Sequence, residues 1–287
     1  MMKKMASRFF RKLILFSVRN NLDVLFYWIN NLRFILLRLN LTLNYVEING
    51  VKGFKLTDHN LNLERYFIVK YQGYSSYHNG LQKRAEDLGE KSYLLHQIKF
   101  KKGDIVIDIG ANLGDLNLYF QCQKTEIIYY GFEPGEHEYC CLEKNIEQKA
   151  TNHIFQLALG DKNGSLVFYY KPDNGDSSII PMQDYQKKIN VEVKTYDTII
   201  RDLNLSDKKI KLLKLEAEGF EPEIIKGAKE YLANIEYISA DLGFERGVTQ
   251  STTSPEVINF LLKNEFKIID QSRNRNIFLF KNLNFDS

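Results

Sequence analysis

Glycine and acidic residues gather at the ends of several short apolar runs in this 287-residue sequence. The first group, "DIGANLGD", supplies Asp108, Gly110, Asn112 and Gly114 directly after the run "IVI". Gly110 would let the backbone approach a ligand closely, and Gly114 would open a helix whose amide end is partly positive. Dehydrogenases place glycines as G-x-G-x-x-G at such a turn. The spacing here is G-x-x-x-G, so the turn alone leaves the kind of nucleotide ligand open.

Acidic side chains end the next two apolar runs. Glu133 ends "YYGFEP" about twenty residues after the glycine turn, where a carboxylate can accept hydrogen bonds from both hydroxyls of a ribose. An ordinary helix-starting acid before Pro134 is the alternative. Asp161 ends "LALGD", where it could accept a hydrogen bond from the amino group of an adenine in an apolar slot. S-adenosylmethionine carries ribose and adenine without a diphosphate, and it therefore fits these three run ends.

Three further carboxylates lie in two later segments. "KLEAEGFEPEIIKGA" holds Lys214, Glu216 and Glu218 in alternation on an apolar strand, so their side chains are expected to project to one face. Buried charges are costly unless paired, and a structural Lys214–Glu216 ion pair is one interpretation. In the other, the carboxylates act in catalysis. "SADLGFERG" places Asp241 across the cleft, unless that loop only solvates the edge of the domain.

From Asp104 onwards, apolar runs of about six residues alternate with helical periodicity, which predicts parallel strands joined by crossover helices. Seven strands are expected, at 105–110, 127–134, 153–161, 210–219, 235–243, 266–272 and 276–283. Only "RNRN" separates the last two, so they should form an antiparallel hairpin. The predicted fold is α/β, a Rossmann-like, mostly parallel seven-stranded sheet with an antiparallel C-terminal hairpin, as in class I methyltransferases. An insertion at 165–196, with Asn174-Gly175 inside it, should form a loop over the cleft or a surface excursion.

These motifs resemble the FkbM family of S-adenosylmethionine-dependent methyltransferases. "DIGANLGDLNLYF", "GFEP", "LALGD", "TYDTII" and above all "KLEAEGFEPEIIKGA" carry the resemblance, over roughly residues 80–283. Where the family usually has Asp after the lysine, this sequence has Glu216, which is one methylene longer. The resemblance implies O-methyl transfer to a hydroxyl of a sugar, glycan, glycolipid or secondary metabolite.

Two sets of site residues follow from these motifs. We expect S-adenosylmethionine to bind at Asp108, Gly110, Asn112, Gly114, Glu133 and Asp161. An alcohol loses a proton as it is methylated, and a carboxylate within hydrogen-bond reach is a suitable base, so Glu218, Asp241 and Glu216 are the catalytic candidates. No metal is expected. A non-catalytic S-adenosylmethionine-binding scaffold protein and a methyltransferase acting on a macromolecule are the competing hypotheses.

The formal net charge of +3 is unevenly distributed. Eight Lys and Arg accompany one acid in residues 1–46, so that segment carries +7 and the remainder −4. An acidic main domain argues against nucleic acid as its partner. The three cysteines, Cys122, Cys140 and Cys141, show no C-x-x-C pairing, which favours reduced thiols and a cytoplasmic location.

Residues 1–44 predict a basic amphipathic helical extension. Its apolar residues recur three and four positions apart, which places them on one stripe: Leu22, Leu25, Phe26, Ile29, Leu32, Ile35, Leu36 and Leu39. Arg and Asp interrupt the segment too often for a spanning helix, and no export cleavage site follows "LILFSV". The stripe either packs on the main domain or on a second subunit in a homo-oligomer, or lies on the anionic inner face of a membrane.

Two more regions complete the predicted organisation. Residues 45–79 read as short alternating segments around Asn49-Gly50, and such a dipeptide between alternating segments predicts a hairpin in a small β element. Residues 80–287 form the predicted methyltransferase domain.

Overall fold

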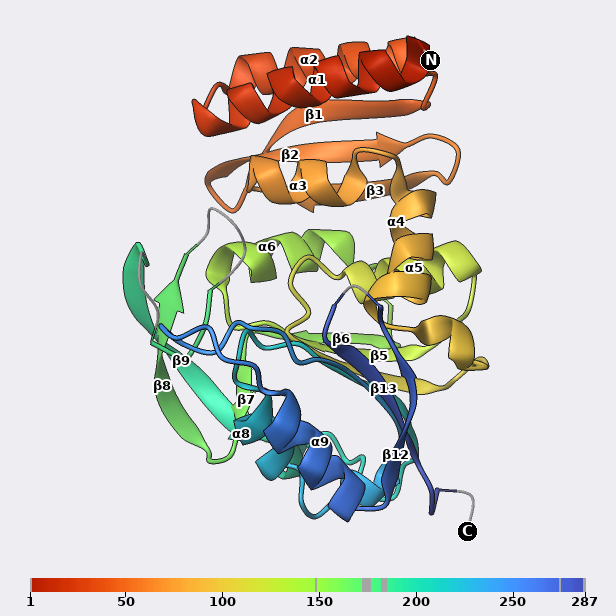
Figure 1. Ribbon diagram of the computed structural model, residues 1–287, viewed down its shortest axis with the longest axis vertical. Helices are drawn as coiled ribbons and strands as arrows, with labels where there is room; N and C mark the ends of the chain where they lie inside the picture. The colour runs from red at the N-terminus through yellow and green to blue at the C-terminus, as the bar shows by residue number, and fades with distance from the viewer. Residues whose placement is uncertain (1, 148, 172–176, 182–184, 274, 286–287) are drawn as a thin grey trace.

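A seven-stranded sheet forms the centre of the molecule (Figure 1). The computed structural model describes residues 2–147, 149–171, 177–181, 185–273 and 275–285, and it describes side chains from Arg8 onwards. The strands of the sheet are β4 (Ile105–Ile109), β5 (Ile128–Phe132), β6 (Asn152–Phe155), β10 (Ile210–Leu215), β11 (Ile235–Asp241), β12 (Phe266–Gln271) and β13 (Ile277–Asn282). Their order is β12-β13-β11-β10-β4-β5-β6; β13 runs antiparallel to β11 and β12, and the other neighbouring pairs are parallel. The predicted class I methyltransferase sheet is thereby confirmed.

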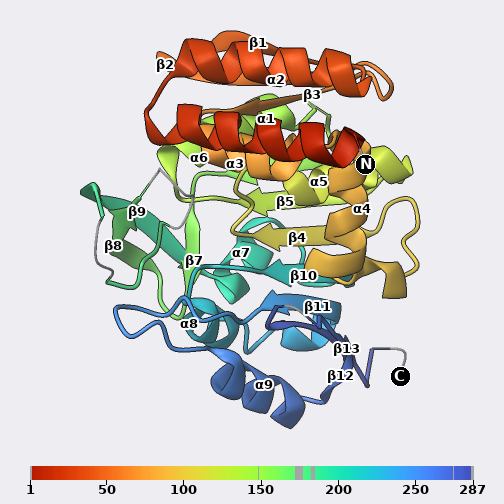
Figure 2. The same ribbon diagram turned by 45° about the horizontal axis from the view of Figure 1, so that its top comes forward.

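Helices cover both faces of this sheet (Figures 1 and 2). One face carries α7 (Tyr196–Asp202), α8 (Glu221–Lys226) and α9 (Ser254–Lys263), and the other carries α4 (Leu81–Asp87), α5 (Asp115–Gln123) and α6 (Glu136–Asn145). In β4, Ile107 and Ile109 pack in the same cluster as α7 to α9, whereas Val106 packs with Leu116 of α5. Because successive side chains of a strand point to opposite faces, a strand covered on both sides is apolar throughout.

The third predicted strand is divided in two. Its first half is β6, and its second half is β7 (Ala158–Gly160), which leaves the main sheet. β7 pairs with β9 (Lys187–Thr195), and β9 pairs with β8 (Gly164–Tyr170), in a separate three-stranded sheet. Asn174 and Gly175, where a loop over the cleft was expected, lie outside the described residues.

The N-terminal region folds into its own small sheet covered by helices. α1 (Met2–Arg19) and α2 (Asp23–Leu37) precede the antiparallel strands β1 (Leu41–Ile48), β2 (Val51–Asp58) and β3 (Leu63–Phe67), and α3 (Lys70–Tyr77) follows them. Asn49 and Gly50 have φ of 46° and 80° between paired Ile48 and Val51, as a tight hairpin turn requires. The sheet begins at Leu41, so the boundary expected after residue 44 falls inside β1.

The apolar residues of α2 do not form one stripe. Phe26 and Ile29 are buried in a cluster with residues of the small sheet, whereas Leu32, Ile35 and Leu36 are exposed. The helix is therefore apolar on two faces, one packed and one open. Within the described part of the chain, no helix combines the length and apolar character that crossing a membrane requires.

Asn145, at the end of α6, joins the small sheet to the main domain. Its Oδ1 accepts a hydrogen bond from Tyr66 N at 2.6 Å, and its Nδ2 donates to Tyr66 O at 3.0 Å and to Leu113 O at 2.9 Å. The adjacent Arg65 is buried and donates to Asn145 O at 2.6 Å and to Gln121 Oε1 at 2.9 Å. These contacts tie β3 to the helical layer of the large domain.

Replacing Asn145 by Ala should lower the free energy of unfolding by about 2–4 kcal/mol, because part-buried backbone groups of Tyr66 and the buried carbonyl of Leu113 would lose their partners. Denaturant titration measures this loss. Asn264→Ala is the matched control, since the Asn264 amide is exposed and donates only to Phe260 O. Equal losses in both variants would contradict the joining role of Asn145.

Candidate active site

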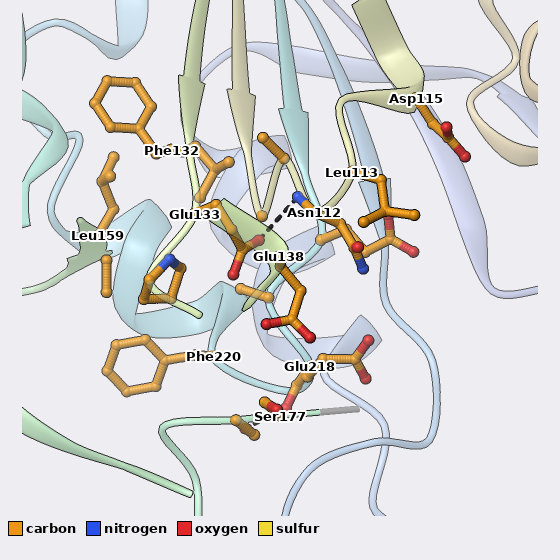
Figure 3. A pocket seen from close by; sticks show the side chains of 18 of the residues that line it. Asn112, Leu113, Asp115, Phe132, Glu133, Glu138, Leu159, Ser177, Glu218 and Phe220 are labelled. Atoms are coloured by element: carbon orange, nitrogen blue, oxygen red, sulfur yellow. Dashed lines mark hydrogen bonds between the residues drawn. The ribbon is translucent and has the colours of Figure 1, made fainter. Parts of the chain in front are cut away.

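A pocket opens at the carboxyl ends of β4, β5 and β10 (Figure 3), the edge at which open parallel sheets bind ligands. Each of these strands contributes residues from the turn that follows it: Gly110, Ala111 and Asn112 after β4, Glu133 and Pro134 after β5, and Glu216, Ala217 and Glu218 after β10. The topology thus brings together residues that are more than a hundred positions apart in the sequence.

Glu133 lies at the centre of this pocket and is almost fully buried. Its Oε2 accepts a hydrogen bond from Asn112 N, and its Oε1 accepts one from Gly135 N, both at 2.8 Å. Burial, followed by the nearby charge of Glu138, raises the pKa of Glu133 to about 8. Each carboxylate oxygen keeps a further lone pair, so Glu133 can still accept hydrogen bonds from a diol.

Glu138 is a pocket residue that sequence reasoning missed. Its side chain is 5% exposed, burial raises its pKa to about 7, and its Oε2 has no hydrogen-bond partner among the described residues. A Cβ on Gly135 would lie 2.4 Å from Glu138 Oε2 and 3.0 Å from Glu133 Oε1, so the two carboxylates crowd over this glycine. In the sequence, Glu138 reads only as an acid in the first turn of a helix, which is why no signal marked it.

The opposite wall of the pocket is apolar (Figure 3). Phe132, Leu159 and Phe220 form it, and a flat aromatic ligand such as adenine fits between such side chains. Asp161, which was expected to complete this slot, is exposed and does not line the pocket. The physical reason is the divided third strand, because β7 carries Asp161 away from the edge of the main sheet.

The two glycines of the turn have different roles. Gly110 has φ of 73°, and a Cβ there would lie 1.8 Å from Glu216 O, so only glycine allows the ends of β4 and β10 to meet. Gly114, with φ of 79°, precedes α5, and a Cβ would meet Leu142 of α6 at 2.9 Å. Gly110 lines the pocket and Gly114 does not, so Gly114 shapes the turn and the packing of its helix.

Lys214 is the most buried cation near the site, with a side chain that is 2% exposed. Its Nζ donates to Gly110 O at 2.5 Å and to Ile109 O at 3.3 Å, and it lies 3.2 Å from both Asp108 Oδ1 and Glu216 Oε2. Burial alone would lower the pKa of Lys214, but Asp108 and its other anionic neighbours raise it well above the ordinary value. The ammonium therefore remains charged.

Asp108 does not line the pocket. It is 1% exposed, it faces Lys214 across the β4–β10 pairing, and its Oδ2 accepts a hydrogen bond from Tyr129 OH at 2.6 Å. Its contacts with Lys214 and Tyr129 thus hold the strand ends together.

Glu216 and Asp241 share one arginine. Arg275 Nη2 lies 3.4 Å from Glu216 Oε1 and contacts Asp241 Oδ2 directly, while Tyr93 OH donates to Glu216 Oε2 at 3.0 Å. Burial favours the neutral form of Glu216, but Lys214 and Arg275 outweigh it and lower the pKa of this carboxyl. Burial and the charge of Glu216 raise the pKa of Asp241 to about 6. Arg275 and Glu216 line the pocket, and Asp241 lies behind them.

Glu218 lies in the turn that follows β10. β10 ends at Leu215, and Glu218 has a left-handed φ of 49°, so the predicted alternation of Lys214, Glu216 and Glu218 on one face is wrong beyond the end of the strand. Glu218 lines the pocket beside Ser177 (Figure 3), and Ser178 Oγ donates to Glu218 O at 2.8 Å. Because of this turn, the Glu218 carboxylate faces the pocket from a different side than Glu216 does.

The N-terminal region closes one side of the pocket. Gln72 of α3 lines it, and Gln72 Nε2 donates to Asn112 Oδ1 at 2.7 Å. Tyr77 OH donates to Asp115 Oδ1 at 2.6 Å, and Arg84 Nε donates to Asp115 Oδ2 at 2.7 Å. No motif marked these residues, because their place in the site depends on how the small sheet packs against α5.

These residues fit the chemistry of S-adenosylmethionine. Two carboxylates lie where a ribose diol would bind, an apolar slot lies beside them, and the buried Glu138 Oε2 lacks a partner that a hydroxyl could supply. Among the described residues, no group of three or more His, Cys, Asp and Glu side chains is arranged to hold a metal ion. The sheet order and this pocket define the class I methyltransferase fold.

Comparison with known proteins identifies the family. The model of the methyltransferase FkbM domain matches residues 108–268, and the chain belongs to the FkbM methyltransferase family. The chain is 23% identical over 172 residues to the 31-O-demethyl-FK506 methyltransferase FkbM of Streptomyces tacrolimicus, a match that covers 49% of this chain and 65% of that protein. It is 23% identical over 193 residues to the 2-O-methyltransferase NoeI of Sinorhizobium fredii, covering 61% and 77% of the two chains.

The chain thus spans just under two thirds of the length of the first of these relatives. Among solved structures, M. capricolum TrmK in complex with S-adenosylhomocysteine is similar, with a TM-score of 0.37 and 12% identity over 66% of each chain.

Glu133→Gln tests the buried carboxylate of the pocket. Because the folded-state pKa is raised from 4.5 to about 8, the folded protein binds more protons than the unfolded chain in that range, and its stability falls as pH rises through it. The Gln side chain does not titrate, so the variant lacks this loss. The free energy of unfolding of the variant, relative to that of the native protein, should therefore rise between about pH 5 and about pH 9.

At pH 9, where the Glu133 carboxyl is ionised, the same variant should bind S-adenosylhomocysteine roughly 10- to 100-fold more weakly, because an amide offers one acceptor oxygen where the carboxylate offers two. Calorimetric titration measures the binding, and denaturant titration at both pH values measures the stability. Glu143→Gln is the control, because Glu143 is an exposed acid of α6, the helix that follows Glu133. An unchanged affinity would exclude Glu133 from the binding site.

Proposed function

We propose that this protein is an S-adenosylmethionine-dependent O-methyltransferase whose acceptor is a hydroxyl of a sugar, glycan or glycolipid, or of a secondary metabolite. The observation that carries the proposal is the buried Glu133, which the glycine turn holds through Asn112 N beside an apolar slot. Membership of the FkbM family supports methyl transfer. The names of the relatives, a 31-O-demethyl-FK506 methyltransferase and a 2-O-methyltransferase, support oxygen as the acceptor atom.

In this proposal the pocket would hold the donor. Glu133 and Glu138 would accept hydrogen bonds from its ribose hydroxyls, and Phe132, Leu159 and Phe220, which line the pocket, would enclose its adenine. Gly110 and Asn112 bring the backbone of the turn against the donor. When bound, S-adenosylmethionine would supply a methyl group on a sulfonium for transfer to an oxygen.

The protein has to orient the acceptor and take up its proton. We propose Glu218 as the base, because its carboxylate lines the pocket at the side of Ser177. Asp241 is the second candidate, since a pKa of about 6 suits a base near neutral pH, although Arg275 lies between it and the pocket. Lys214 and Tyr93 hold Glu216 in place, and Glu216 in turn positions Arg275 at the pocket.

We further propose that the protein works in the cytoplasm on a small or glycan acceptor and not on nucleic acid. Cys122, Cys140 and Cys141 are free thiols, as suits a reducing compartment. Residues 47–287 carry a net negative charge, which disfavours binding of a phosphate backbone.

Incubation of the purified protein with methyl-labelled S-adenosylmethionine and separated glycan, lipid, protein and RNA fractions of the host tests the function. Label should enter the glycan or lipid fraction, with a mass increase of one CH₂ group in the labelled species, and Glu133→Gln should lose this transfer. Donor binding without transfer to any fraction would instead indicate a binding or scaffold protein. Transfer to RNA or protein would indicate a macromolecular acceptor.

Glu218→Gln should lower kcat by roughly 10²- to 10⁴-fold while the dissociation constant of S-adenosylhomocysteine stays near that of the native protein, because the variant loses a base and not a donor contact. Asp241→Asn provides the comparison between the two candidate bases. Glu192→Gln, at an exposed position of β9, is the control. If Glu218→Gln keeps its turnover while Asp241→Asn does not, the base is Asp241.

A further inference from the structure

The open face of α2 is apolar along its whole length. Five large side chains that recur four, four, three and one positions apart share it, and each is between 50% and 72% exposed: Val24, Trp28, Leu32, Ile35 and Leu36. That spacing lies on one side of a helix, opposite the buried Phe26, Ile29 and Phe34. An apolar surface of this continuity is unusual on a helix exposed to water.

No charged side chain interrupts this face. α2 contains two charged residues, Asp23 and Arg33. Arg33 is buried and donates to His78 O at 2.5 Å, and Asp23 pairs with Lys70 Nζ at 2.5 Å. Both charged side chains therefore contact other parts of the protein, and the open face of α2 carries apolar side chains.

The helix beside α2 exposes several cations. α1 lies beside α2, and the two helices form the outermost layer at one end of the molecule (Figures 1 and 2). α1 exposes Phe9 and Phe16 together with four basic side chains, and Arg38 is exposed directly after α2; the basic residues of α1 are Arg8, Arg11, Lys12 and Arg19. Asp23 is the only acid in residues 1–46, and Lys70 neutralises it. The layer is thus both apolar and strongly positive.

We propose that the α1–α2 layer docks this protein on an anionic lipid bilayer, with the open face of α2 in the headgroup region. Aromatic and aliphatic side chains bordered by Arg and Lys are the composition of helices that lie in such an interface. The positive charge is complementary to acidic headgroups.

A second copy of the chain suits this layer less well than a bilayer does. A two-fold interface places the same surface patch on both partners, so the basic residues of α1 would face their own counterparts. Asp23, the one acid of residues 1–46, is already paired and could not compensate them. Charge complementarity therefore favours an anionic surface.

This docking goes beyond the proposed methyl transfer and is independent of it, because lipid binding requires neither donor nor acceptor. It would hold the pocket near acceptors that are assembled on or in the membrane. A negative result for vesicle binding can therefore be distinguished from a negative result for methyl transfer.

Co-sedimentation of the full chain with vesicles tests the proposal. The native protein should pellet with vesicles of phosphatidylglycerol and phosphatidylcholine, pellet far less with phosphatidylcholine alone, and be released by salt. The combined variant Trp28→Ser, Leu32→Ser, Ile35→Ser should partition at least about tenfold more weakly. The matched control replaces Phe244, Val248 and Leu283 by Ser, since these are 52–64% exposed apolar residues of the main domain, and it should bind as the native protein does.

A second variant keeps the test decisive if the first folds poorly. Arg8→Gln, Lys12→Gln, Arg19→Gln leaves the apolar face intact and should weaken binding to the anionic vesicles specifically. Failure of the native chain to bind anionic vesicles would overturn the proposal, and so would full binding by either variant. Light scattering of the native chain and the serine variant gives one further outcome. A dimer that the serine substitutions dissociate, without any vesicle binding, would assign this face to a second copy.

Discussion

The buried ammonium of Lys214 is the constraint on which the site depends. A charge with 2% exposure is stable only if its surroundings satisfy it, and here Asp108, Glu216 and two backbone carbonyls do so. Those partners come from β4, from the turn after it and from the end of β10. One cation therefore holds two neighbouring strand ends in register and fixes the carbonyl of Gly110, so the turn that borders the pocket is shaped before any ligand binds. Removing Lys214 would leave the buried Asp108 without a cationic partner, with only the hydrogen bond from Tyr129 OH.

The pocket beside this network holds two buried acidic side chains. Glu133 and Glu138 are buried close together, and burial raises the pKa of both. A ligand that donates hydrogen bonds to them would favour their charged forms and lower both pKa values. The cationic side of the site, with Lys214 and Arg275, keeps Glu216 charged and holds Asp241 close to it. Carboxyl groups with raised and with lowered pKa values thus lie within one cleft, as acid–base chemistry requires.

The N-terminal region serves the site and also leaves a surface open. Through Asn145 and Arg65 it is anchored to α5 and α6, and through Gln72 it reaches Asn112 in the pocket. α2 packs one apolar face on the small sheet and exposes the other. The two interpretations of the apolar stripe, packing and membrane contact, therefore concern different faces of the same helix and do not exclude each other.

Local patterns were enough to predict the sheet, its final hairpin, the Asn49-Gly50 turn and the position of Glu133, because each depends on residues adjacent in the chain. Continuous apolar runs mark strands buried on both faces, and a parallel sheet brings their carboxyl ends to one edge. Asp161 could not be placed correctly, since β7 leaves the main sheet to pair with β9, a strand almost thirty residues later. Glu138, Gln72 and Arg275 enter the pocket from a helix, from the small sheet's flanking helix and from the final hairpin, and no local pattern records where those elements pack. Periodicity identified the apolar residues of α2, but it could not say which of them are covered, because burial is a property of neighbours that only the folded chain supplies.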